Sequence, residues 1–175
     1  MENTDQKAKQ LALGGVLAAL AVVILLLGGL IPGGTYITPM LASVLLIPLL
    51  AELPKGLCVG WYAIVALLGV LLCPDKETAF VFVFLGWFPI AKPALDRLPK
   101  LPRLVCKLLI FNAAVAALYS LLILIFRLEA LLQEARETGL ALLLVLLLLG
   151  NLSFLLLDLT LQRLTALYRA KRPRP

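Results

Sequence analysis

The sequence predicts an all-α, polytopic membrane protein, folded as a compact bundle of six transmembrane helices with both termini in the cytoplasm. Of its 175 residues, 62% are hydrophobic, and the charged 15% fall almost wholly between long apolar runs. Several of these runs reach or approach the roughly 20 residues that cross a bilayer as a helix. Backbone groups in hydrocarbon need partners within a helix or a closed barrel, and leucine-rich runs without period-two alternation exclude the barrel.

Length and composition exclude several kinds of protein. A chain of 175 residues has room for short-looped spans but not for a soluble domain as well, so we expect one integral membrane domain over residues 1–175. The chain has no histidine, and its three cysteines form no CxxC pair. We therefore expect no enzyme activity, metal, cofactor or disulfide framework. Basic loops on one side of a membrane explain the net charge of +6, and we expect no nucleic-acid partner.

Glycine and proline separate the first three helices. The first is longer than the apolar part of a signal peptide and lacks a cleavage site, so we expect it to remain; it ends between Gly28 and Pro32. The second is interrupted by Pro48 and ends before Pro54, and the third ends before Pro74. The predicted bounds are 11–31, 39–53 and 57–73.

Proline and charge also separate the last three helices. The fourth ends near Pro89 and Pro93, and a basic, proline-rich stretch over 92–103 leads to the fifth. An amphipathic surface turn or short helix over 127–138 precedes the sixth, which continues toward a basic tail over 169–175. The predicted bounds are 78–91, 104–126 and 139–162.

The second and fourth predicted helices are short. At 14 or 15 residues each, they measure about 22 Å by helix rise, less than a full hydrocarbon core. Either they pack inside the bundle or line a cavity, where broken helices are tolerated, or the predicted bounds are wrong by several residues.

The distribution of basic residues predicts the orientation. With six spans, 13 of the 16 Lys and Arg residues share a side with both termini. Because basic residues accumulate in cytoplasmic loops, both termini are predicted to be cytoplasmic, in the cell membrane. The three on the other side are Lys76, Arg127 and Arg136.

Small residues recur at four-residue spacing along the first helix. Gly14 pairs with Ala18 and Gly15 with Ala19. Such pairs allow a second helix to approach closely, so that van der Waals packing supplies the attraction. The second helix belongs either to the same bundle or to another membrane subunit.

Two loops on the predicted outer side carry polar residues. If the bundle brings these loops together, they form a site suited to a small polar ligand. In the alternative interpretation they are solvated, and Asp75 or Thr78 caps the fourth helix. The loop residues are Thr35, Tyr36, Thr38, Asp75, Lys76 and Glu77.

Polar residues inside the spans are a third candidate set. Asn112 and Asn151 both lie near mid-depth, so they are placed to meet as interhelical hydrogen-bonding partners. Asp158 lies at a depth close to Lys107 and Lys92, which favours an ion pair over a proton relay. Trp87 is either an interface anchor or a wall of a ligand cavity. The further candidate ligand contacts are Trp87, Asn112, Tyr119 and Asn151.

The amino-terminal region resembles one family of membrane proteins. A basic start leads directly into residues 9–20, KQLALGGVLAAL, and six helices follow with both ends inside. This arrangement is similar to the substrate-binding S components of energy-coupling factor transporters. The resemblance covers the whole chain in topology and only the first helix in motif.

The resemblance implies specific roles. The coupling face toward a shared transmembrane subunit, which works with two ATPases, would be Gly14, Gly15, Ala18 and Ala19. The loop over 33–38 would close over a small-molecule ligand, for which the sequence carries no vitamin signature. The chain also lacks a phosphate loop, so energy would come from its partners. A non-transporting scaffold or assembly protein that binds other transmembrane helices is the alternative.

Overall fold

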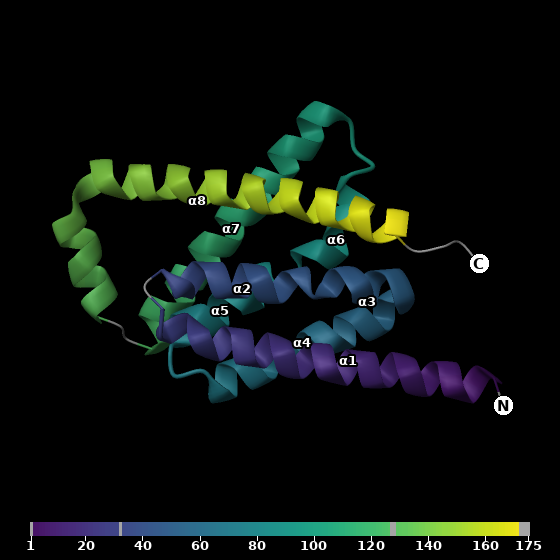
Figure 1. Cartoon of the computed structure of the whole chain (residues 1–175). Helices are drawn as coiled ribbons and strands as arrows, with labels where there is room; N and C mark the ends of the chain where they lie inside the picture. The colour runs from purple at the N-terminus through teal and green to yellow at the C-terminus, as the bar shows by residue number, and fades with distance from the viewer. Residues whose placement is uncertain (1, 32, 127–128, 172–175) are drawn as a thin grey trace. The chain divides into compact units, whose positions relative to one another are not determined.

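The computed structural model describes residues 2–31, 33–126 and 129–171, and every element in these ranges is helical. The helices follow one another along the chain with short connections (Figure 1). They are α1 (Glu2–Leu26), η1 (Leu27–Gly29), α2 (Gly34–Val44), α3 (Leu46–Glu52), α4 (Lys55–Leu72), α5 (Lys76–Leu85), α6 (Phe88–Leu95), α7 (Lys100–Phe126) and α8 (Glu129–Lys171).

Six stretches in the described ranges are long and apolar enough to cross a membrane, which confirms the predicted number and the all-helical, membrane-compatible class. Some of them combine two consecutive helices. They are Ala8–Gly29, Gly34–Glu52, Lys55–Leu72, Lys76–Leu95, Lys100–Leu122 and Leu144–Ala170.

Of the two alternatives for the second and fourth spans, the one in which the predicted bounds are wrong by several residues is confirmed. Gly34–Glu52 has 19 residues and Lys76–Leu95 has 20, which is about 30 Å of helix. Both begin earlier than predicted, since polar loop residues form their first turns. Gly33, at φ 76°, caps α2 with a left-handed conformation that suits glycine.

Each of these two spans contains a break. The first lies at Leu45, three residues before Pro48, because the proline ring would clash with the carbonyl group four residues earlier, at Val44. The second lies at Gly86 and Trp87, where a Cβ atom on Gly86 would come within 2.6 Å of the Phe82 carbonyl oxygen. The predicted interruption by Pro48 is therefore confirmed, with the break itself displaced.

The last two helices are longer than predicted. The basic stretch supplies the first turn of α7, which begins at Lys100 rather than at 104. Residues 129–138 belong to α8 instead of forming a separate turn, and α8 continues to Lys171 rather than ending near 162. Residues 127–128 of the predicted amphipathic segment lie outside the described residues.

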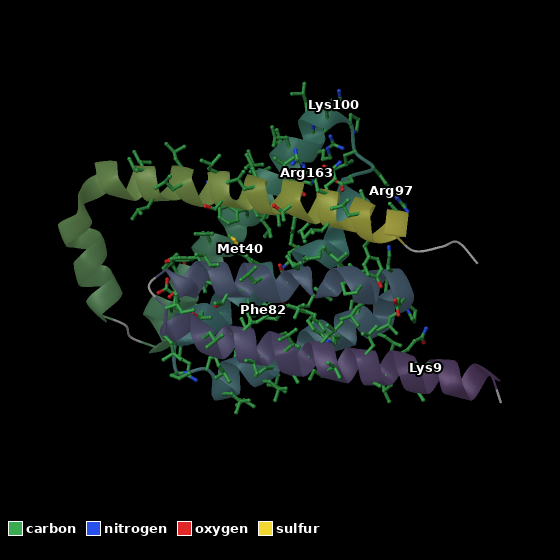
Figure 2. All side chains as sticks on the ribbon, in the orientation of Figure 1. Lys9, Met40, Phe82, Arg97, Lys100 and Arg163 are labelled. Carbon is green, nitrogen blue, oxygen red and sulfur yellow. The ribbon has the colours of Figure 1, made fainter. Side chains whose placement is uncertain are left out.

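The chain divides into two compact units, with one boundary at the end of α6 and the other inside α8. Unit 1 comprises residues 1–94 and 161–175, and unit 2 comprises residues 95–160. In unit 1, α1 packs on α2 and α4, and α5 packs on α2 and α4 (Figure 1). The apolar core of unit 1 includes the buried side chains of Leu25, Leu46, Val65 and Phe82. Phe82, labelled in Figure 2, has 0% exposed surface.

Unit 2 contains all of α7 and α8 as far as Thr160. Phe111 of α7 stacks on Phe154 of α8, with ring centroids 4.7 Å apart and planes at 22°. Offset stacking of aromatic rings is favourable beyond the area that it buries. This stack and two polar contacts described below join the helices of unit 2.

Candidate functional site

The first turn of α2 meets the start of α5, at one end of unit 1. The Thr35 hydroxyl donates to Asp75 Oδ2 at 3.2 Å, and the Tyr36 hydroxyl donates to Glu77 Oε1 at 2.7 Å. The two predicted outer loops are therefore brought together. We call this set the loop cluster: Thr35, Tyr36, Thr38, Asp75, Lys76 and Glu77.

Asp75 is the centre of the loop cluster. Its carboxylate accepts hydrogen bonds from the backbone N–H of Glu77 at 3.0 Å and from the hydroxyls of Thr78 and Thr35. The first of these is an N-cap of α5, as the capping interpretation predicted. Glu77 lies in the first turn of α5, where negative charge is favoured by the helix dipole. One carboxylate thus starts a helix and holds the neighbouring loop.

Lys76 closes the preceding helix. Its ammonium donates to the carbonyl oxygens of Val70 and Cys73, each at 2.9 Å. A cation at a helix carboxyl terminus satisfies carbonyl groups that have no partner within the helix. Burial raises the pKa of the Cys73 thiol, and the nearby Lys76 opposes that rise. Adjacent residues therefore end α4 and begin α5.

Glycines allow close packing beneath the loop cluster. A Cβ atom on Gly28 would lie 2.6 Å from both Thr38 Oγ1 and Thr78 Cγ2, and one on Gly34 would lie 2.5 Å from the Gly28 carbonyl oxygen. Thr38 is 5% exposed and donates to the Gly34 carbonyl at 2.9 Å. From the sequence, Gly28 and Gly34 are predicted only as helix breakers, and their role in close packing appears only in the structure.

Asn112 and Asn151 meet in unit 2, as predicted. Each amide donates to the side-chain oxygen of the other, at 2.9 and 3.1 Å. Each amide nitrogen also donates to a backbone carbonyl one turn earlier, at Leu108 and Leu147. The pair thus forms a closed set of hydrogen bonds, which is the interhelical role that the sequence analysis favoured.

Lys107 and Asp158 form the predicted ion pair in unit 2. Lys107 Nζ lies 2.8 Å from Asp158 Oδ2 and 2.9 Å from Oδ1. It also lies 2.6 Å from Asp96 Oδ1, a partner that the sequence analysis missed. The exposed fractions of the side chains are 4% for Lys107, 14% for Asp158 and 33% for Asp96. We call these three residues the ion triad.

The two other predicted ligand contacts, Trp87 and Tyr119, are not part of the loop cluster. Trp87 lies in the turn between α5 and α6, where its indole N–H donates to the Phe84 carbonyl at 2.7 Å. Tyr119 is half-buried on α7 in unit 2. Their part in ligand binding stays a prediction.

The small residues of α1 lie on two sides of the helix. Gly14 accepts a hydrogen bond from the Trp61 indole at 3.0 Å, and Ala18 packs against the core of unit 1. Gly15 and Ala19 are exposed. Packing inside unit 1 therefore accounts for Gly14 and Ala18, and leaves Gly15 and Ala19 on an open face.

The other end of α1 carries a second polar contact within unit 1. The Gln10 amide donates to the Glu52 carbonyl at 3.0 Å, and the Tyr168 hydroxyl donates to Glu52 Oε1 at 2.7 Å. These residues come from the starts or ends of three spans. The sequence offered no signal for this contact, because Glu52 and Tyr168 are separated by most of the chain.

Neither a metal-ligand cluster nor a comparison with known proteins assigns a further role to these residues. Among the residues whose side chains the structure describes, no three acidic or cysteine side chains gather as metal ligands would. Comparison of the chain with protein families, curated proteins and solved structures finds no match.

Proposed function

We propose that this protein is the membrane-embedded, small-molecule-binding component of an uptake transporter, similar to the S components of energy-coupling factor transporters. The loop cluster carries the proposal. It brings two hydroxyls, a phenol and two carboxylates to one end of unit 1, at the starts of α2 and α5. Breaking the Thr35–Asp75 and Tyr36–Glu77 hydrogen bonds would expose these groups to a small polar ligand.

The contacts within unit 1 support a position of the loop cluster on the outer side of the membrane. Gln10, Glu52 and Tyr168 share one end, although they belong to the first, second and sixth spans. That arrangement requires an even number of crossings between them. With 13 of 16 basic residues on the side of the termini, that side is the cytoplasm and the loop cluster lies outside.

The open face of α1 supports a partner subunit. Gly15 and Ala19 are exposed at four-residue spacing, and a Cβ atom on Gly15 would meet nothing within 4 Å. Such a face allows close approach of a helix from a transmembrane coupling subunit, which would be bound in turn to two ATPases. Energy for uptake would come from these partners.

A scaffold that binds other transmembrane helices without transport is the second candidate. The tight contacts at Gly28 favour it, since the close packing of Gly28 against Thr38 and Thr78 beneath the loop cluster leaves little space there for a ligand. The open face of α1 serves this function equally well.

Native mass spectrometry of the detergent-purified protein distinguishes the two functions. Uptake predicts a retained small molecule, whose occupancy falls in Tyr36→Phe, which loses the phenol hydroxyl, and in Glu77→Gln, which loses the negative charge of the carboxylate. Thr160→Val, which removes only a hydroxyl bonded to its own helix, is the matched control. Purification with stoichiometric protein partners and no small molecule would favour the scaffold.

A further inference from the structure

A short sequence repeat leads into α7. The segment consists of Arg97-Leu98-Pro99, Lys100-Leu101-Pro102 and Arg103-Leu104, so that a cation is followed by leucine three times. We call it the basic repeat. It lies wholly in unit 2 and covers the turn after α6 and the first turn of α7.

Within the part of the chain whose side chains are described, the three cations of the basic repeat have no hydrogen-bond or salt-bridge partner. Arg97 and Lys100, labelled in Figure 2, are exposed, and Arg103 is half-exposed. Among the residues with described side chains, none forms a salt bridge or side-chain hydrogen bond with these three. Lys107, one turn beyond Arg103, differs, because it is 3% exposed and bonded to Asp96 and Asp158. The basic repeat therefore carries uncompensated positive charge.

Exposed apolar side chains alternate with these cations. Leu98 is 37% exposed, Leu101 78% and Leu104 44%, at the start of the Lys100–Leu122 span. A span boundary lies where hydrocarbon gives way to headgroups. Leucine side chains there contact acyl chains, while the long stems of Lys and Arg carry the charge outward to the phosphates.

Proline fixes the geometry of the repeat. Pro99 and Pro102 restrict the backbone, and proline is tolerated in the first turn of a helix, where N–H groups lack partners. The Arg103 N–H closes the turn onto the Pro99 carbonyl oxygen at 3.0 Å. The cations are thus held at fixed spacing, which lowers the entropy lost when they bind a charged surface.

We propose that the basic repeat binds anionic phospholipids, with Arg97, Lys100 and Arg103 on the lipid phosphates and Leu98, Leu101 and Leu104 against the acyl chains. The charge on the protein selects lipids with net negative headgroups over zwitterionic ones. This surface is independent of the loop cluster and of any transported ligand.

The test measures lipid binding to the full chain in detergent by native mass spectrometry. Phosphatidylglycerol is titrated against phosphatidylcholine with the same acyl chains. The unaltered protein binds phosphatidylglycerol more tightly, and R97Q/K100Q/R103Q weakens that binding by about fivefold for each cation removed. Binding of phosphatidylcholine stays unchanged.

The matched control removes the same charge elsewhere. K55Q/R163Q/R169Q alters three exposed cations outside the basic repeat and retains the preference for phosphatidylglycerol. Equal weakening by both triple variants, or no preference in the unaltered protein, would overturn the proposal. Displacement of the lipid by millimolar inorganic phosphate would also overturn it, since the surface would then bind free phosphate.

A charge-preserving variant distinguishes the effect of lost charge from that of a folding defect. R97K/R103K keeps the three positive charges and retains lipid binding with little change. Loss of the preference in this variant, with an unchanged melting temperature, would contradict a role for net charge.

Discussion

Asn112 on α7 and Asn151 on α8 donate hydrogen bonds to each other, at 2.9 and 3.1 Å. Each amide also donates to its own helix, so both N–H bonds of each side chain have acceptors. In hydrocarbon no water replaces a lost partner, so the two residues act as a unit.

Replacing one asparagine of this pair leaves the other amide without its partner on the neighbouring helix. Asn112→Leu destabilises the protein by about 1 kcal/mol, the usual size of an interhelical hydrogen bond in a membrane. Asn112→Leu with Asn151→Leu costs less than the sum of the single changes, because neither amide is then left unpaired. Reversible unfolding in detergent measures all three, and additive single effects would contradict the pairing.

Replacing Lys107 of the ion triad is predicted to lower the free energy of unfolding more than replacing Asn112 does. Lys107→Met leaves two carboxylates in a site where the lysine side chain is 4% exposed. Removing one partner of a buried pair costs about 3–5 kcal/mol. Asp158→Asn in the Lys107→Met background recovers part of that loss, because it removes one of the two negative charges that Lys107 no longer neutralises. Unfolding midpoints report the recovery, and a double variant less stable than Lys107→Met would exclude this explanation.

Two glycines on the first span provide a matched comparison. Gly28→Ala places a methyl group 2.6 Å from Thr38 and Thr78, which costs about 1–3 kcal/mol. Gly15→Ala meets nothing within 4 Å and gains helix propensity, so it is neutral or stabilising by less than about 1 kcal/mol. Melting temperatures in one detergent compare the two. Equal effects would show that the packing at Gly28 is looser than described.

Asp75 is predicted to stabilise the start of α5. Asp75→Ala removes the N-cap and the acceptor for Thr35, and an N-cap alone is worth about 0.5–2 kcal/mol. Asp75→Asn keeps an acceptor and retains most of that stability. Hydrogen exchange at the first amides of α5 resolves the difference, and equal protection in both variants would contradict the capping role.

The number of spans follows from the sequence because the bilayer sets how long an apolar run must be. The meeting of Asn112 with Asn151 and of Lys107 with Asp158 follows from depth, which is counted from the ends of each run. The two loops of the loop cluster share a side for the same reason.

Other features depend on contacts that a local pattern does not encode. Gly34 and Lys76 looked like loop residues, and they begin helices because Gly33 and Asp75 cap them. Asp96 lies in a stretch that predicted only a basic loop, so its contact with Lys107 appears only once the chain is folded. A glycine that breaks a helix cannot be distinguished, from the sequence alone, from a glycine that allows close packing.

Accessibility labelling in intact cells tests the threading of the chain most directly. Single cysteines are placed at Pro74, Lys55 or Arg169, each exposed, in a protein whose Cys58, Cys73 and Cys106 are replaced by serine or alanine. A membrane-impermeant maleimide labels Pro74→Cys in intact cells, and it labels Lys55→Cys and Arg169→Cys only after lysis. Labelling of Arg169→Cys from outside would contradict six crossings with cytoplasmic ends, and the proposed outer position of the loop cluster would be wrong with it.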